Sequence, residues 1–312
     1  MDVSQAQHVK RPPFPPTLAL LSGILAVSTG AIFVRLADEA PPLVVAAYRV
    51  GIASALLAPL AWWRARHELR ALGRRDYALA VLAGFFLALH FATWVTSLYY
   101  TSVASSVVLV NTNPLWVGLL APVVSKDRIT RLMAAGIVMS VVGGVIIGLG
   151  DLAISGQALW GDILAVMGSI SAAFYILLGR NVRRQVSLLA YVMVCYGSAA
   201  LFLWAIVLAT GQPITGYGSS TYAVFLGMAL IPQIIGHSSY NWALEWVSAS
   251  MVAVGLLGEP IGSTILAYIL FGERLTWAKV VGGGFILAGI YLTARGEAAS
   301  TSGAPEALEP AG

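Results

Sequence analysis

The feature that most restricts the fold of this chain is a succession of long apolar segments separated by short polar ones. Ten such segments occur, at residues 18–34, 43–63, 77–100, 102–124, 132–149, 158–178, 188–209, 222–242, 249–271 and 277–294. Most approach the roughly 20 apolar residues that cross the hydrocarbon core of a bilayer. Because lipid offers the backbone no hydrogen bonds, spanning segments of this kind must be helical. The sequence therefore predicts an all-α integral membrane protein with ten transmembrane helices.

Composition excludes several other classes of protein. Hydrophobic residues make up 58% of the chain and charged residues 10%, whereas soluble domains are roughly a quarter charged. At 312 residues the chain has room for ten spans and short loops, but not for a domain outside the membrane. The single cysteine, Cys195, lies in an apolar segment, so we expect a packing role and neither a disulfide nor a metal site. We expect no cofactor and no nucleic-acid partner.

The distribution of basic residues predicts the orientation. With the N-terminus inside, the inner side carries fourteen of the 18 lysines and arginines. The outer side carries three, of which Lys279 lies near the outer end of the tenth segment, and Arg49 lies within a span. Cytoplasmic loops of membrane proteins normally carry this excess. Both termini are therefore predicted to be cytoplasmic.

One unit occurs twice in the chain. A shift of 146 residues superposes several pairs: Pro114 on Pro260, Asp127 on Glu273, Arg128 on Arg274, Thr130 on Thr276, Gly136 on Gly282, Gly143 on Gly289 and Gly150 on Gly296. Each copy holds five spans, an odd number, so the second copy must enter the membrane from the opposite face. Inverted repeats of this kind place a substrate site near the midplane. The predicted divisions are a cytoplasmic lead at 1–16, repeats at 17–150 and 156–296, and a disordered cytoplasmic tail at 297–312.

An acid and a proline interrupt the ninth apolar segment at Glu259-Pro260. A carboxylate at bilayer depth is costly and marks a functional site by default, and proline removes a helical hydrogen bond. Glu259 is predicted to couple transport to protons or to bind a substrate ammonium. The alternative is that Glu259 only holds the helix break, which Pro114 repeats in the fourth segment.

Other polar residues follow helical stripes. They are His90, Trp94 and Ser97 in the third segment, Ser106 and Asn113 in the fourth, Ser171 and Tyr175 in the sixth, Gln233, His237, Tyr240 and Asn241 in the eighth, Ser263 in the ninth, and Ser22 and Thr29 in the first. Polar groups facing lipid would be unsatisfied, so these stripes are predicted to turn inward. They either line a polar path, in which the histidines can relay protons, or hydrogen-bond between packed helices.

Arg49 lies a few residues into the second segment. We expect it to extend toward the interface or to pair with Asp38 or Glu39. The functional alternative is a clamp for a carboxylate, which guanidinium matches as a fork. Arg49 and Lys279 are the basic residues within spans, and this shortage argues against doubly charged substrates such as sugar phosphates.

The repeated five-span unit, the prolines of the fourth and ninth segments, the tetrad Glu273-Arg274-Leu275-Thr276 and the glycine-rich segment after it resemble the drug/metabolite transporter superfamily. The chain looks like its ten-span branch, which is built from two EamA domains. The resemblance implies a secondary-active carrier, usually an exporter of amino acids or similar small metabolites, in an inner membrane. It also implies a central cavity lined by the first, third, fourth, sixth, eighth and ninth spans.

Alternatives from other classes remain at this stage. A passive channel also fits inverted repeats, and a non-transporting scaffold or membrane enzyme fits the composition. Gly148-Leu149-Gly150-Asp151 matches part of an intramembrane aspartyl protease pattern, but the second aspartate is missing, so we predict no enzyme. The neutral and aromatic stripes favour a small zwitterionic or neutral substrate. Glycines of the fifth and tenth segments indicate close helix packing, within a monomer or across a homodimer.

Overall fold

The computed structural model describes residues 12–101, 106, 109–148, 157–271 and 276–302. Within these residues every regular element is a helix. Seven helical stretches there are long and apolar enough to cross a membrane: Pro16–Leu36, Pro42–Arg64, Arg74–Ser97, Ala158–Arg183, Leu188–Ala209, Ser219–Ala243 and Ala249–Leu270. Two shorter apolar helices cover Asn113–Val124 and Arg131–Ile146. The all-helical membrane class is confirmed, whereas the count of ten spans stays a prediction.

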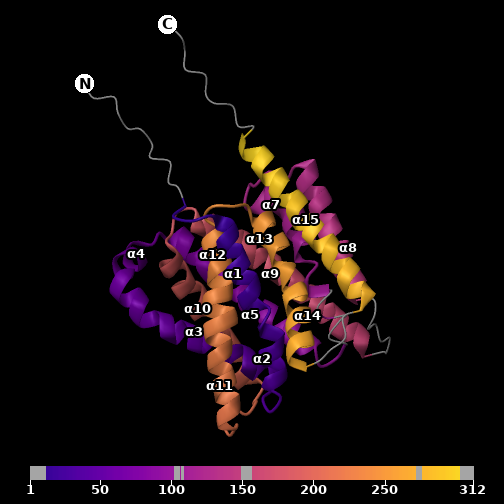
Figure 1. Cartoon of the computed structure of the whole chain (residues 1–312). Helices are drawn as coiled ribbons and strands as arrows, with labels where there is room; N and C mark the ends of the chain where they lie inside the picture. The colour runs from indigo at the N-terminus through magenta and orange to yellow at the C-terminus, as the bar shows by residue number, and fades with distance from the viewer. Residues whose placement is uncertain (1–11, 102–105, 107–108, 149–156, 272–275, 303–312) are drawn as a thin grey trace, which may run out of the picture.

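The described helices have the following bounds, and all of them except η2 are labelled in Figure 1. They are α1 (Pro16–Val27), α2 (Gly30–Leu36), α3 (Pro42–Arg64), α4 (Arg66–Ala71), α5 (Arg74–Ser97), α7 (Asn113–Val124), α8 (Arg131–Gly148), α9 (Ala158–Arg183), α10 (Leu188–Ala209), α11 (Ser219–Met228), η2 (Ala229–His237), α12 (Ser238–Ala243), α13 (Ala249–Leu256), α14 (Gly258–Phe271) and α15 (Trp277–Ser302).

Two segments that the sequence presents as continuous are broken helices. The first segment divides into α1 and α2 at Ser28-Thr29. The ninth divides into α13 and α14 at Leu257, just before Glu259-Pro260. In the fourth segment α7 begins at Asn113, with Pro114 in its first turn, where a proline costs no helical hydrogen bond. In both repeats, therefore, a helix break lies next to the proline that the 146-residue shift relates: Pro114 in the first repeat and Pro260 in the second.

The eighth segment remains helical but changes its winding. It passes from α11 through a π-helix, η2, into α12, and Pro232 lies inside the π-helical part. Wide π turns are rare and often occur at functional sites. The sequence showed only the proline, so the change of winding was not predicted.

Helices α8 and α15 lie side by side and run antiparallel (Figure 1). A Cβ on Gly289 would lie 2.5 Å from the Gly136 carbonyl oxygen, and one on Gly143 would lie 2.5 Å from the Gly282 oxygen. Between these contacts Ser140 Oγ donates to the Ile286 carbonyl at 3.5 Å. Gly136 and Gly143 of α8 thus meet Gly289 and Gly282 of α15 in reverse order, as an antiparallel pair requires. These glycines are thus used in packing within the monomer, and a homodimer contact stays a prediction.

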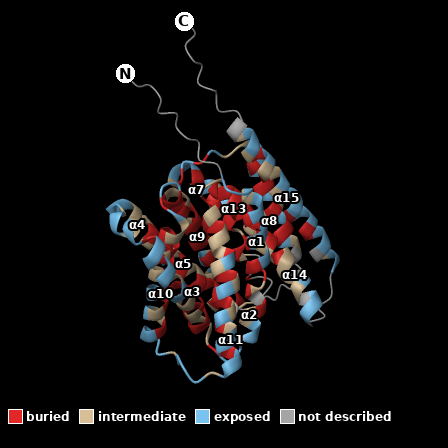
Figure 2. Ribbon diagram, turned by 60° about the vertical axis from the view of Figure 1, so that its left-hand side comes forward, coloured by how far each residue is buried: buried red, intermediate tan, exposed pale blue. Residues whose placement is uncertain are grey.

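The core lies where α3, α5, α9 and α10 pack against one another. Figure 2 shows buried residues along the inner faces of these helices and exposed residues on outer faces such as that of α4. Cys195 is fully buried in this core, as its predicted packing role requires. Exposed apolar side chains such as Leu25 and Leu201 cover the outside, the arrangement expected of a surface that meets lipid.

The predicted disordered tail needs a correction at its start. Helix α15 continues past Arg295 to Ser302. The physical reason lies at Glu297, whose carboxylate accepts hydrogen bonds from Ser248 N at 2.7 Å and Ser248 Oγ at 2.5 Å. This contact ties the end of α15 to the start of α13. Residues 1–11 and 303–312 lie outside the described residues.

Candidate functional site

The break between α1 and α2 is in contact with the start of α14, next to the break between α13 and α14. Ser28 Oγ donates to the Ile24 carbonyl at 2.6 Å and contacts the Glu259 carbonyl at 3.4 Å. Ser263 Oγ donates in return to the Ser28 carbonyl at 3.1 Å. A Cβ on Gly262 would come within 2.1 Å of Ser28 Oγ, so glycine is required for this approach. The Ser28 carbonyl at the first break is thereby satisfied by Ser263 of the other broken segment, as bilayer depth demands.

Glu259 lies in the first turn of α14 and is half-buried. The N-terminal end of a helix favours a negative charge. Its carboxylate interacts electrostatically with Arg49 of α3 and with Tyr240 of α12. Whether Glu259 carries protons, binds a substrate ammonium or only holds the helix break stays a prediction.

Arg49 corrects one expectation from the sequence. Its side chain does not extend to the interface: it is 4% exposed, and its Nε donates to Gln233 Oε1 at 2.8 Å. Nη2 contacts the Pro232 carbonyl at 3.5 Å, and the guanidinium lies 4.4 Å from the centre of the Phe91 ring. Arg49 thus points into the bundle, held by the π-helical segment.

Glu39, one of the partners expected for Arg49, binds elsewhere. It accepts hydrogen bonds from Gly218 N at 3.0 Å and Thr221 Oγ1 at 2.8 Å, at the start of α11. The first of these donors, followed by the second, lowers the pKa of Glu39 below its ordinary value. Glu39 therefore binds at the start of α11 and does not pair with Arg49.

A series of ring contacts extends from Phe91, the ring over which the Arg49 guanidinium lies. The Phe91 ring lies 5.4 Å from His237 and 5.0 Å from His90, and His90 stacks on Trp94 at 5.9 Å. His237 in turn lies 6.1 Å from Tyr175. The third, sixth and eighth segments therefore bring their predicted stripes together. Phe91 was missed because an apolar residue carries no polar signal, although the 146-residue shift superposes it on His237.

A chain of hydrogen bonds continues from Tyr175. The Tyr175 hydroxyl donates to Asn241 Oδ1 at 2.9 Å, and Asn241 Nδ2 donates to the Tyr196 hydroxyl at 3.1 Å. Tyr196 also contacts Ser238 Oγ at 3.2 Å. Asn241 is thereby fully engaged and holds the sixth, seventh and eighth segments together. Tyr196 lies in the seventh segment, for which the sequence analysis predicts no polar stripe.

We call the following ten residues the central polar cluster: Arg49, His90, Phe91, Trp94, Tyr175, Gln233, His237, Tyr240, Asn241 and Glu259. Four of their buried polar atoms have no hydrogen-bond partner within the described part of the chain: Trp94 Nε1, Gln233 Nε2, His237 Nδ1 and the Tyr240 hydroxyl. Buried polar groups are normally paired, so each exception calls for an explanation such as a ligand or water.

His90 of the cluster, and several predicted site residues outside it, also make hydrogen bonds within the bundle. His90 Nδ1 pairs with the Gly168 carbonyl at 2.9 Å, which links α5 to α9. Ser97 Oγ pairs with Ser106 Oγ at 2.6 Å, and Ser171 Oγ donates to its own helix at Met167. Asn113 Nδ2 reaches the Val110 carbonyl at 3.4 Å, and its Oδ1 has no partner among the described residues. Ser97 and Ser106 thus link the third segment to the fourth, whereas Ser171 bonds within its own helix; that any of these residues lines a polar path stays a prediction.

An ionic network closes one end of the bundle. Asp127, which follows α7, lies 2.6 Å from Arg184 Nη2 and 3.5 Å from Arg180 Nε at the end of α9. Its other oxygen accepts from Ala249 N at 3.2 Å, at the start of α13. Arg183 adds an ion pair with Glu245 at 2.5 Å. We call this group the basic-end network; it joins the first repeat to the second.

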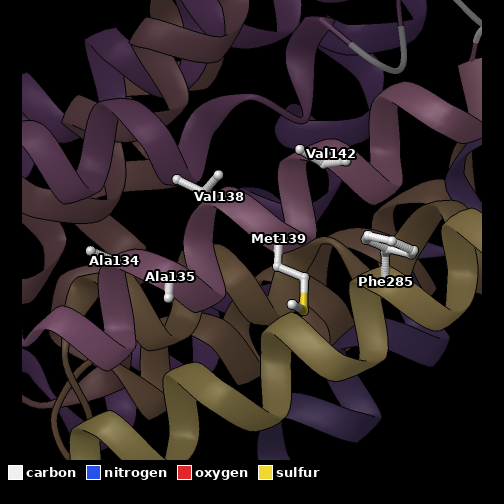
Figure 3. Close-up of a pocket in the computed structure, with 6 residues that line it drawn as sticks. All are labelled: Ala134, Ala135, Val138, Met139, Val142 and Phe285. Carbon is white, nitrogen blue, oxygen red and sulfur yellow. The ribbon is translucent and has the colours of Figure 1, made fainter.

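A groove elsewhere on the molecule is apolar. It lies between α8 and α15, has a volume of about 470 Å³, and is lined by the six residues labelled in Figure 3: Ala134, Ala135, Val138, Met139, Val142 and Phe285. Its lining offers no charged or hydrogen-bonding side chain. The groove is therefore unsuited to a polar substrate.

Comparison with known proteins agrees with this architecture. A family model described as the EamA-like transporter family matches residues 15–149 and 159–295. A protein of Archaeoglobus fulgidus named "Uncharacterized transporter" is 27% identical over 268 residues, which cover 84% of this chain and 91% of that protein. The "Uncharacterized transporter YyaM" of Bacillus subtilis is 25% identical over 66% of this chain and 68% of its own. One crystal structure shares the fold, with a TM-score of 0.75 at 17% identity over 91% of this chain and 98% of that chain.

Proposed function

Because the chain belongs to the EamA-like transporter family and is a membrane transporter, we propose that it is a secondary-active carrier of small metabolites, with its substrate site at the central polar cluster. The observation that carries the proposal is the buried Arg49 and the half-buried Glu259, which interact electrostatically among aromatic rings and unpartnered polar atoms. Ionisable groups within membrane spans are costly and normally mark a substrate or ion path.

The proposed mechanism is alternating access between two inverted repeats. The antiparallel pairing of α8 with α15 supports it, because Ser140 and Ile286, which contact each other, are related by the 146-residue shift. Broken helices near a midplane site are a further feature of such carriers. The basic-end network crosslinks the two repeats at one end. In the proposed cycle this network opens when that end admits or releases substrate.

The proposed substrate is a small zwitterion or neutral metabolite, such as an amino acid. One acid, one arginine and neutral hydrogen-bonding groups suit such molecules better than multiply charged anions. Export is the proposed direction. Glu259 is the proposed proton carrier, and His237, in ring contact with Phe91 and Tyr175, is placed to assist. We propose an inner-membrane protein with both termini in the cytoplasm.

Reconstitution into liposomes tests carrier function directly. Purified protein is expected to give saturable uptake of a radiolabelled metabolite and counterflow, in which unlabelled metabolite inside the vesicle accelerates entry of label. A carrier shows counterflow because its binding site must return to the outer side before more label can enter, and unlabelled substrate inside the vesicle speeds that return. A channel has no such step. Linear, non-saturating flux would favour the passive channel. Flux equal to that of empty liposomes for every metabolite in a broad panel would contradict transport.

A further inference from the structure

We propose that Arg49 is the recognition group for a carboxylate, so that the substrate is a small monocarboxylate and, because of Glu259, a zwitterionic one. This inference rests on the proposed function and names the substrate class of the same site. It separates the two substrate classes left open above, since a neutral metabolite without a carboxylate would leave Arg49 without a counter-ion.

The hydrogen bonds of Arg49 orient its guanidinium without neutralising it. Nε donates to an amide oxygen, that of Gln233, and Nη2 contacts a backbone carbonyl, that of Pro232. Both acceptors are uncharged. Nη1 lies 4.0 Å from the Cβ position of Gly30 and donates no hydrogen bond within the described ranges. One edge of the fork is therefore fixed by the protein, and the Nη1 side keeps unused donors.

The charge of this guanidinium calls for an anion. Arg49 is 4% exposed, and among the described ion pairs none within 4 Å involves it. A buried cation without a counter-ion is unfavourable. Glu259 reduces this penalty through its electrostatic interaction, but it does not form a direct pair. A ligand that brings its own carboxylate would complete the pair in the bidentate geometry that guanidinium prefers.

The residues around Arg49 further restrict the class of substrate that fits the site. Phe91 covers one face of the guanidinium at 4.4 Å, which leaves its edge for a planar anion. Tyr240 and His237 carry unpartnered polar atoms near the same ring system. The Glu259 carbonyl lies 3.4 Å from Ser28 Oγ, two residues before Gly30, whose Cβ position is 4.0 Å from Arg49 Nη1, so Glu259 is close to the same side of the site. A second negative charge on the ligand would be repelled by the Glu259 carboxylate, whereas an ammonium would be attracted to it. The geometry thus favours one carboxylate and one cationic group over a dianion.

Gln233 is the positioning residue of this arrangement. It is 0% exposed, and its Oε1 accepts from Arg49 while its Nε2 has no partner among the described residues. Glutamate has the same shape as glutamine but is negatively charged, so it could act as the counter-ion that Arg49 lacks. Gln233→Glu is therefore expected to supply the counter-ion from within the protein and to compete with the ligand carboxylate.

Four probes that share a phenylethyl body separate the two charges. L-phenylalanine carries both groups, 3-phenylpropionate only the carboxylate, phenethylamine only the ammonium, and 3-phenylpropionamide neither. Binding to purified protein is measured by the ligand-dependent shift in unfolding temperature and by titration calorimetry. The wild type is expected to bind L-phenylalanine and 3-phenylpropionate, with the amide at least about tenfold weaker, as for loss of a charged partner.

Matched variants assign the effect to individual groups. Gln233→Glu is expected to weaken both carboxylate probes at least about tenfold while raising the unfolding temperature of the ligand-free protein. Arg49→Lys keeps the charge and loses the fork, so an intermediate loss is expected. Glu259→Gln should weaken L-phenylalanine but not 3-phenylpropionate. Gln185→Glu adds the same charge at an exposed position outside the cluster and should change nothing.

The outcomes are decisive in both directions. The proposal would be overturned by any of three results: equal binding of probes with and without a carboxylate, binding unchanged by Gln233→Glu, or no binding of any carboxylate probe to the wild type. Because these measurements use detergent-solubilised protein, they do not require transport. Intact probe binding without flux in liposomes would contradict the proposed function alone, and saturable flux with carboxylate-independent binding would contradict this inference alone.

Discussion

Replacing Glu259 by glutamine is expected to reduce saturable flux by about 100-fold or more while the protein still inserts and folds. The substitution keeps the shape of the side chain and removes the charge that interacts with Arg49 and Tyr240. Because an amide carries neither the negative charge nor the proposed coupling proton, the coupled step is lost, and a fall of about 100-fold corresponds to about 2.8 kcal/mol at about 1.4 kcal/mol per factor of ten. Initial rates in liposomes, normalised to inserted protein, measure the loss.

Glu39→Gln is the matched control for this change. Glu39 lies outside the spans and accepts hydrogen bonds from Gly218 N and Thr221 Oγ1, which an amide oxygen can also accept. Its flux is therefore expected to stay close to that of the wild type. If Glu259 carries the coupling proton, any residual flux of Glu259→Gln should also lose its dependence on pH. Full, pH-dependent transport by Glu259→Gln would remove this carboxylate from the mechanism.

Gly143→Ala is expected to lower the unfolding temperature sharply, whereas Gly144→Ala, one residue later, is not. A Cβ at Gly143 would lie 2.5 Å from the Gly282 oxygen and 2.8 Å from Ile286 N, both backbone atoms that cannot move without shifting α15. Overpacking of this kind typically costs about 1–3 kcal/mol. A Cβ at Gly144 meets nothing within 4 Å, and alanine there gains about 0.5–1 kcal/mol in helix propensity.

The two variants share a helix, a residue type and a substitution, so the difference between them isolates the contact with α15. Unfolding followed by tryptophan fluorescence in detergent gives both midpoints. A second pair extends the test, because Gly289 meets the Gly136 oxygen at 2.5 Å while Gly284 meets nothing within 4 Å. Equal midpoints for Gly143→Ala and Gly144→Ala would show that α8 and α15 do not pack as described.

Much of this architecture was predictable because it depends on patterns that repeat. The apolar segments predicted the helices, and the 146-residue shift predicted that related glycines would lie in related helices. That shift also leads from Pro260 back to Pro114, and both prolines lie beside a helix break. Glu259 was found because a carboxylate in an apolar segment has few structural uses.

The rest depends on contacts between distant segments, which no local pattern encodes. The break at Ser28 has no proline and depends on contacts with Glu259 and Ser263 of the ninth segment. Arg49 was expected at the interface because long basic side chains usually reach water there. The π-helix offered Gln233 and Pro232 as acceptors, and this alternative becomes visible only once α3 and η2 are placed together.

The inversion of the two repeats is the claim on which the transport mechanism depends, and residues 131 and 277 test it most directly. They are related by the 146-residue shift, begin α8 and α15, and are both exposed. In a Cys195→Ala background, Arg131→Cys and Trp277→Cys are each labelled with a membrane-impermeant maleimide, applied first to intact cells and then to inverted vesicles. We expect position 277 to react only in intact cells and position 131 only in inverted vesicles. Reaction of both positions from the same side would contradict the account.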